Sequence, residues 1–259
     1  MACHGVAGTH FGPLSVDGPA PPRVSPGGEV GLVALFQIGI FVAANLAVVP
    51  FLTKDAKVGG GLGPILTSFP AGWLVLVFGV ITICRKRGTP WPTAVGFDAV
   101  RPVDALGIAV GAALQVLVGV AYHVARVDSE DLARPARELA SRAGAIGSGF
   151  VVLAVFVVVG APLCEELFYR GVVLNALRRV GEDQTSGPSP RTTVLAVLGS
   201  AVWFGLIHLQ PLQFPALVVV GLVCATARLR TGRLATAIAV HMGFNAVAIV
   251  SLGLELSHR

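Results

Sequence analysis

Hydrophobic positions in this chain form long unbroken runs, without the strict alternation that is typical of half-exposed strands. The runs that contain no charged side chain cover residues 30–53, 58–84, 105–125, 143–164, 192–227 and 234–254. Each of them reaches the roughly 20 residues that an α-helix needs to cross about 30 Å of hydrocarbon. The pattern therefore predicts a chain that crosses a membrane several times.

The run from 192 to 227 is long enough for two shortened spans, and Pro211 and Pro215 mark the expected turn between them. Helices are expected rather than a barrel, because lipid leaves every backbone amide to find a partner within the protein and the runs lack the two-residue period of barrel strands. The predicted fold is an all-α, polytopic membrane bundle with about seven transmembrane helices.

The composition supports this prediction. The chain is 54% hydrophobic and 13% charged, whereas soluble domains have about 25% charged residues. The first 29 residues contain five prolines, so residues 1–29 are expected to form a disordered tail and residues 30–256 a single integral membrane domain. The net charge of +5 does not indicate nucleic-acid binding, because no basic stripe is interleaved with aromatic residues.

Basic residues beside the spans predict the orientation of the chain. Eleven fall on the side of the N-terminus and seven on the opposite side, which favours a cytoplasmic N-terminus. The eleven are Arg23, Arg85, Lys86, Arg87, Arg101, Arg178, Arg179, Arg191, Arg228, Arg230 and Arg233. Arginine outnumbers lysine sixteen to three, as in bacterial genomes rich in G and C, so the expected location is a bacterial cell membrane.

Three charged side chains interrupt an otherwise apolar stretch. Glu165, Glu166 and Arg170 are the only charged residues between Arg142 and Arg178. Because each costs about 2.5–3.5 kcal/mol at the centre of a membrane helix, we expect them to have a function. Glu166 and Arg170 are four residues apart and are predicted to pair. Glu165 is then free to face a cavity, where a poorly solvated carboxylate is a stronger base.

Two further polar pairs lie in other spans. Phe204 and His208 are four residues apart, and so are His241 and Asn245, so each pair is expected on one face of its helix. The depth of each polar residue is counted from the basic residue at the end of its helix, at 1.5 Å per residue. By this count Glu165, His208, His241 and Asn245 lie about 12–25 Å from that end. They can therefore meet in one layer near the middle of the membrane.

These residue types are sufficient for peptide hydrolysis. Glu165, assisted by His208, is expected to take a proton from the water that attacks the scissile carbonyl. His241 and Asn245 are expected to donate hydrogen bonds to the oxyanion that develops. Glu166 is included in the catalytic group because it borders the predicted base.

Supporting roles are expected for three neighbours. Arg170 is the structural partner of Glu166, and Phe204 packs beside the site. Tyr169 lies four residues after Glu165, so it is placed to donate a hydrogen bond to that carboxylate.

At these positions the chain resembles the CPBP family of CAAX proteases and bacteriocin-processing enzymes, also called the Abi or type II CAAX prenyl endopeptidase family. EELFYR at 165–170 corresponds to the family motif EExxxR, FGLIH at 204–208 to FxxxH, and HMGFN at 241–245 to HxxxN. The resemblance covers about residues 145–250. It implies an intramembrane glutamate-dependent endopeptidase without a cofactor, acting on a membrane-associated protein or peptide.

Other functions remain open from the residues alone. Glu165, His208 and His241 form a reasonable ligand set for zinc, although no HExxH motif is present. A metal-dependent protease is thus the first alternative. The second is a membrane protein without catalysis, such as an immunity factor, a scaffold or a transporter whose carboxylates relay protons.

Overall fold

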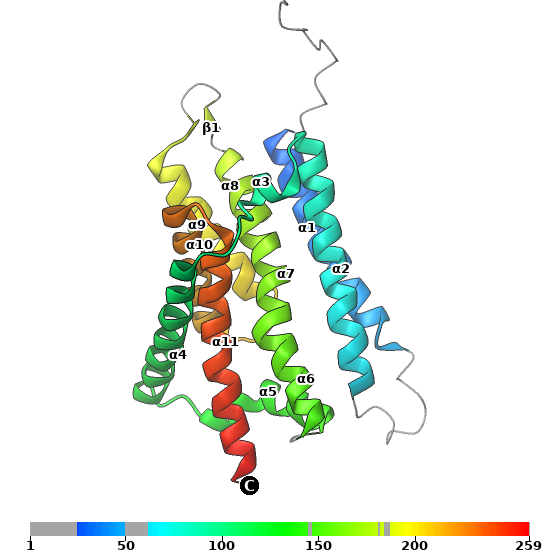
Figure 1. Ribbon diagram of the computed structural model, residues 1–259, viewed down its shortest axis with the longest axis vertical. Helices are drawn as coiled ribbons and strands as arrows, with labels where there is room; N and C mark the ends of the chain where they lie inside the picture. The colour runs from blue at the N-terminus through cyan, green and yellow to red at the C-terminus, as the bar shows by residue number, and fades with distance from the viewer. Residues whose placement is uncertain (1–24, 50–61, 145–146, 181, 184–186, 259) are drawn as a thin grey trace, which may run out of the picture.

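The structure is a computed structural model that describes residues 25–49, 62–144, 147–180, 182–183 and 187–258. Its helical elements are α1 (Pro26–Leu46), α2 (Leu62–Arg87), α3 (Trp91–Val95), the 3₁₀ turn η2 (Pro102–Ala105), α4 (Leu106–Val124), α5 (Ser129–Ala143), α6 (Ser148–Val155), the π-helical turn η3 (Phe156–Gly160), α7 (Ala161–Phe168), the π-helical turn η4 (Tyr169–Val173), α8 (Leu174–Val180), α9 (Pro190–Leu206), α10 (Phe214–Thr231) and α11 (Leu234–Ser257). The short strands β1 (Glu182–Asp183) and β2 (Gly187–Pro188) pair antiparallel between α8 and α9. The predicted all-α fold is confirmed (Figure 1).

Among the described residues, six helices of at least 18 residues are long and apolar enough to cross a membrane. They are Pro26–Leu46, Leu62–Arg87, Pro102–Val124, Ser148–Val180, Phe214–Thr231 and Leu234–Ser257. The seventh apolar helix, α9, has 17 residues. This agrees with the prediction of about seven crossings. The long run from 192 to 227 is broken between Leu206 and Phe214, as expected.

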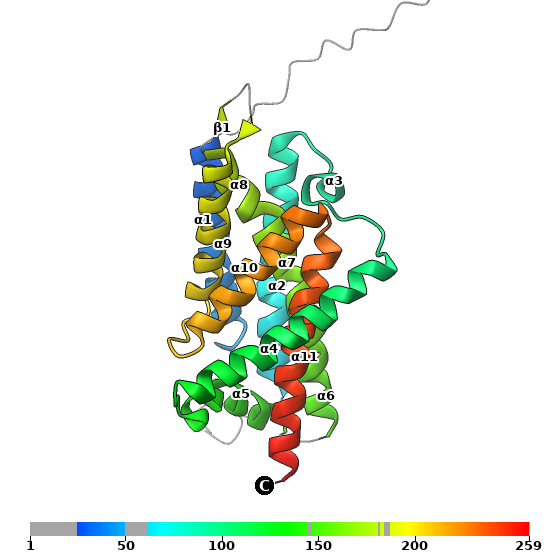
Figure 2. The same ribbon diagram turned by 90° about the vertical axis from the view of Figure 1, so that its left-hand side faces the viewer.

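The helices α9 and α10 form a hairpin that is shorter than the rest of the bundle. Figure 2 shows that its turn lies well above the lower end reached by α11 and α6. Tyr122 on α4 holds this turn through a hydrogen bond from its hydroxyl to the Leu212 carbonyl (2.6 Å), and Gln213 Nε2 donates to Leu132 O on α5 (2.9 Å). The turn after α9, and with it His208, is thereby held inside the span of the bundle.

Helix α5 lies across the end of the bundle that holds the C-terminus (Figures 1 and 2). It has charged residues on one side, while Ala140 and Ala143 are buried against its neighbours. Arg137 on α5 forms ion pairs with Glu130 and, at 2.9 Å, with Glu255 near the end of α11. An apolar face and a charged face are typical of a helix that lies in the membrane interface and does not cross it.

Helices α4 and α11 approach each other closely because glycines line their contact. A Cβ atom on Gly111 would lie 1.8 Å from the Val240 carbonyl oxygen, and one on Gly243 would lie 2.1 Å from the Ile108 carbonyl oxygen. Small residues at such contacts let two membrane helices pack backbone against backbone. The contact fixes the position of α11, which carries His241 and Asn245 on the turns on either side of Gly243.

The first helix begins within the segment that the sequence analysis assigns to the tail. Helix α1 begins at Pro26, and the Ser25 hydroxyl accepts a hydrogen bond from the Gly28 amide. Glu29, expected in the tail, is buried and forms ion pairs with Arg87 and, at 3.1 Å, with Arg179. The two arginines stabilise the buried carboxylate of Glu29. The sequence alone does not show these contacts, because both arginines lie on other helices. Residues 1–24 of the expected tail lie outside the described residues.

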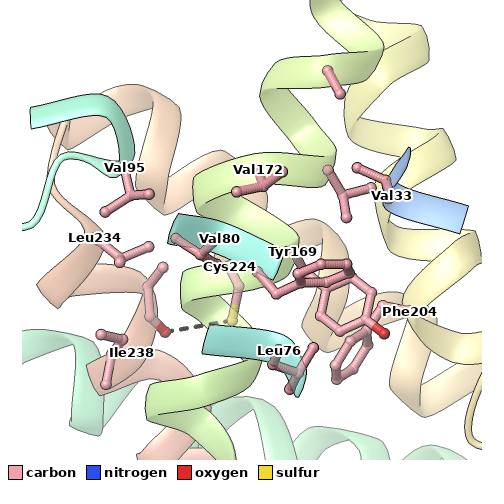
Figure 3. Packing of buried hydrophobic residues seen from close by; sticks show 14 of the residues in the cluster. Val33, Leu76, Val80, Val95, Tyr169, Val172, Phe204, Cys224, Leu234 and Ile238 are labelled. Carbon is pink, nitrogen blue, oxygen red and sulfur yellow. Dashed lines mark hydrogen bonds between the residues drawn. The ribbon is translucent and has the colours of Figure 1, made fainter. Parts of the chain in front are cut away.

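The core brings together side chains from most of the helices (Figure 3). Leu76 and Val80 of α2 face Tyr169 and Val172 of η4, while Phe204 comes from α9. All of these side chains are buried. The polar residues of the three motifs are positioned around this core.

Candidate active site

The two acids lie on a short α-helical segment between two π-helical turns. Within residues 148–180 the helix is interrupted by η3 before α7 and by η4 after it. Pro162 has no amide hydrogen and cannot complete the regular hydrogen-bond pattern in the first turn of α7. The π-helical turn η3 directly precedes this first turn. Such turns are frequent at functional sites, because they rotate the side chains that follow them.

Glu166 and Arg170 form a fully buried ion pair, as their spacing predicts. Arg170 Nη1 lies 2.7 Å from Glu166 Oε1, and neither side chain is exposed. Arg170 Nη2 also donates to the Gly221 carbonyl oxygen on α10 (3.0 Å), and the guanidinium lies 4.9 Å from the centroid of the Phe204 ring. Arg170 therefore ties η4 to α9 and α10, in agreement with a structural role.

His241 on α11 lies between the two acids. Its Nδ1 is 2.9 Å from Glu166 Oε1, and its Nε2 is 3.9 Å from Glu165 Oε2. Because an ionised carboxylate only accepts, Nδ1 donates in the shorter contact. The sequence did not predict this link between Glu166 and the HMGFN motif, since spacing within each helix says nothing about which helices meet.

The accessibility of the two acids differs. The Glu165 side chain is 19% exposed and the Glu166 side chain is 0% exposed. Glu166 contacts both Arg170 and His241 through Oε1. Among the hydrogen bonds of the described residues, none engages the Glu165 carboxylate. Glu165 is thus the acid that a water molecule or a substrate can reach.

His208 does not lie on the helical face that the sequence predicts. Helix α9 ends at Leu206, and His208 follows in the turn. Its Nδ1 lies 2.7 Å from the Phe204 carbonyl oxygen, so the imidazole satisfies a carbonyl that the end of the helix leaves free. A carbonyl only accepts, so Nδ1 donates, and the Nε2 of a neutral ring remains available as an acceptor.

Phe204 contacts both imidazoles. The centroid of its ring lies 4.7 Å from that of His208 and 5.6 Å from that of His241, both in edge-to-face geometry. The side chain is buried and contacts Tyr169 as well, at 5.2 Å. Phe204 therefore packs beside the candidate site and restricts the orientation of both histidines.

Asn245 lies one helical turn beyond His241 on α11. Its Nδ2 donates a hydrogen bond to the Val157 carbonyl oxygen in η3, at 2.8 Å. An amide group has two N–H donors, so one of them is still available for a second acceptor. The π-helical turn η3 thus helps to hold the asparagine close to the helix that carries the acids.

Tyr169 contacts a residue that the sequence analysis missed. Its hydroxyl donates to Gln37 Oε1 on α1 at 2.5 Å, and not to Glu165 as expected. Spacing within one helix does not show that the Tyr169 side chain reaches a partner on another helix, α1. The available signal was a polar residue, Gln37, in the middle of an uncharged run.

An open apolar groove of about 470 Å³ runs along the end of α9. It is lined by Gly199, Val202, Trp203, Leu206, Ile207 and Leu209. His208 lies in sequence between two of the lining residues, Ile207 and Leu209. It offers an apolar surface beside one of the candidate catalytic groups.

Metal binding by the same residues was the first alternative. Within the part of the chain that the structure describes, no three His, Cys, Asp or Glu side chains are grouped so that they could hold a metal ion. Glu165 and His241 are neighbours, and both histidines contact the Phe204 ring. The ligand set of Glu165, His208 and His241 stays a prediction.

Comparison with protein families gives one match. The family described as type II CAAX prenyl endopeptidase Rce1-like matches residues 147–247. Comparisons with curated proteins and with solved structures give no match. The matched region contains the paired acids, both histidines and the asparagine, and it excludes α1 to α5. Residues 147–247 are thus similar to Rce1-like type II CAAX prenyl endopeptidases.

Proposed function

We propose that the protein is an intramembrane endopeptidase in which Glu165 activates the water that hydrolyses a peptide bond. One observation carries the proposal: of two adjacent acids, Glu166 is fully buried and contacts Arg170 and His241 through Oε1, whereas Glu165 is accessible. A general base must be free to accept a proton and must have access to water. The match of residues 147–247 to a family of CAAX-type endopeptidases supports the same reaction class.

Glu165 and His241 can share the attacking water. The 3.9 Å between Glu165 Oε2 and His241 Nε2 is longer than a direct hydrogen bond, which requires about 2.7–3.2 Å. A water molecule beside both groups can donate to the carboxylate and contact the imidazole. We infer that Glu166 keeps the His241 ring in this orientation through its bond to Nδ1.

The reaction then proceeds in two proton transfers. Glu165 takes a proton from the water, and the hydroxide oxygen bonds to the scissile carbonyl carbon. Asn245 donates a hydrogen bond to the resulting oxyanion. His241, whose Nδ1 donates to Glu166, donates from Nε2 when its ring carries a proton on both nitrogens. When the C–N bond breaks, the proton held by Glu165 passes to the leaving nitrogen, which gives a free amine and a carboxylic acid. His208, with Nε2 as an acceptor, assists Glu165 during water activation.

The substrate is a membrane-associated protein or peptide. The apolar groove along the end of α9 is suited to the hydrophobic part of such a substrate, because it lies beside His208 and has almost no polar lining. We further propose a bacterial cell membrane as the location, with the N-terminus in the cytoplasm. No cofactor is assigned to the reaction, and zinc held by Glu165, His208 and His241 is the alternative to be tested.

The test is a comparison of membrane proteomes from cells that express the wild-type chain or Glu165→Gln. This substitution keeps the size of the side chain and removes the base. Protein termini that occur only with the wild type support the proposal, and those lying three residues from a natural C-terminus indicate CAAX-type processing. Identical sets of termini in both cell types, with both proteins inserted in the membrane, contradict the proposal.

A further inference from the structure

Polar side chains are rare in α1, and one of them reaches the candidate site. Gln37 is half-buried in the middle of α1, and its Oε1 accepts a hydrogen bond from the Tyr169 hydroxyl at 2.5 Å. A polar group within a membrane span is unfavourable unless a neighbouring helix supplies a partner. The contact therefore gives both the amide and the buried phenol a partner that lipid cannot provide.

The hydrogen bond to Gln37 restricts the position of Tyr169, and Tyr169 packs against Phe204. Tyr169 is 1% exposed, and its ring meets the Phe204 ring edge to face at 5.2 Å (Figure 3). Phe204 in turn contacts His208 and His241. The rings are close-packed, so a shift of the Tyr169 ring is transmitted to Phe204 and then to both imidazoles.

We infer that Gln37 is a positioning residue of the catalytic centre, acting through Tyr169 and Phe204 on the orientation of His208 and His241. The inference rests on the proposed hydrolase function. Gln37 lies outside the region that matches the endopeptidase family. Helix α1 thus contributes to the site a residue that the family motifs do not contain.

The first measurement is independent of activity. The chain contains two tyrosines, Tyr122 and Tyr169, so Tyr122→Phe leaves Tyr169 as the single reporter in a Raman spectrum. The tyrosine Fermi doublet reports whether the hydroxyl donates a hydrogen bond. Gln37→Leu should change the doublet from that of a donor to that of a free hydroxyl. An unchanged doublet overturns the inference.

The second measurement uses cleavage of an internally quenched peptide that has a farnesylated cysteine three residues before its C-terminus. Gln37→Leu should lower kcat on the order of 10- to 100-fold, because small displacements of catalytic groups have large effects, and should leave KM within about threefold. Tyr169→Phe should give the same loss, and the double variant should be no slower than either single variant. Additive losses overturn the inference.

The matched control is Asn45→Leu, which removes the second amide of the same helix. Asn45 is exposed and donates only to the Phe41 carbonyl oxygen of its own helix (2.8 Å) among the contacts of the described residues. Its removal should leave kcat unchanged. If the wild type does not cleave the peptide or any membrane protein, the proposed function fails and the inference fails with it. If the wild type cleaves and Gln37→Leu keeps full kcat, only the inference fails.

Discussion

Glu165 and Glu166 are adjacent in sequence and occupy opposite environments. Glu166 is fully buried, and its Oε1 contacts Arg170 and His241. Glu165 is partly exposed and 3.9 Å from the second nitrogen of the same histidine. Removing one member of a buried ion pair leaves a charge without a partner, whereas removing an accessible acid does not. At the scale of single residues, the two acids are therefore expected to respond differently to the same substitution.

Glu166→Gln should destabilise the protein by about 3 kcal/mol or more, because Arg170 then lacks its buried carboxylate. Glu165→Gln should change the stability by less than about 0.5–1 kcal/mol. Thermal unfolding of both variants in the same detergent measures this difference. Equal unfolding temperatures would show that Glu166 has no greater structural role than Glu165.

Cleavage should not depend on zinc. Glu165 and His241 are close together, but no three potential ligands are grouped in the described part of the chain. Treatment with a chelator, followed by assay in metal-free buffer, should leave the rate of peptide cleavage unchanged. Loss of activity that zinc restores would instead support the ligand set of Glu165, His208 and His241.

At the scale of elements, the site depends on how closely helices approach. The contact between α4 and α11 has no room for a side chain at Gly111 or Gly243. Both helices must separate or shift if either glycine is replaced. Since His241 and Asn245 lie on α11, such a shift also moves the predicted oxyanion donors away from the acids on α7.

Gly111→Ala should destabilise the protein by about 1–3 kcal/mol or more and reduce cleavage, because the added methyl group overlaps the Val240 carbonyl. Gly119→Ala on the same helix is the control, since a Cβ at that position has nothing within 4 Å. Thermal unfolding and cleavage should distinguish the two variants. Similar behaviour of both would contradict the close contact between α4 and α11.

At the scale of the whole molecule, the connections alternate between two ends of the bundle. The backbone amide of Leu234, at the start of α11, donates to the Gly96 carbonyl, which places the α10–α11 connection beside α3. Helix α5 and the C-terminus lie at the opposite end (Figure 2). The sequence predicted this alternation, because the thickness of the membrane fixes how long an apolar run must be.

The position of the chain in the membrane can be tested in a variant that lacks the four native cysteines. Asp98→Cys and Arg230→Cys should react with a membrane-impermeant maleimide only after the cells are opened. Asp131→Cys and Ser257→Cys should react in intact cells. Reaction of Asp98→Cys and Asp131→Cys from the same side would contradict the fold, and the reverse pattern would contradict the orientation.

What the sequence could not predict are contacts between helices. The spacing of Glu166 and Arg170 predicted their ion pair, which forms although Arg170 lies in the π-helical turn η4. It did not predict that His241 contacts Glu166 or that Tyr169 turns to Gln37, since these contacts depend on π-helical turns and on the packing of separate helices. The position of His208 beyond the end of α9 was missed because the helix stops one turn earlier than the apolar run suggests.

The most direct test of the central claim is peptide cleavage by purified wild-type protein and Glu165→Gln in the same lipid nanodiscs. A general base contributes about 10²–10⁴-fold to the rate, so Glu165→Gln should lose cleavage by at least about 100-fold while its unfolding temperature stays close to that of the wild type. Cleavage by Glu165→Gln at the wild-type rate would contradict the assignment of Glu165 as the base.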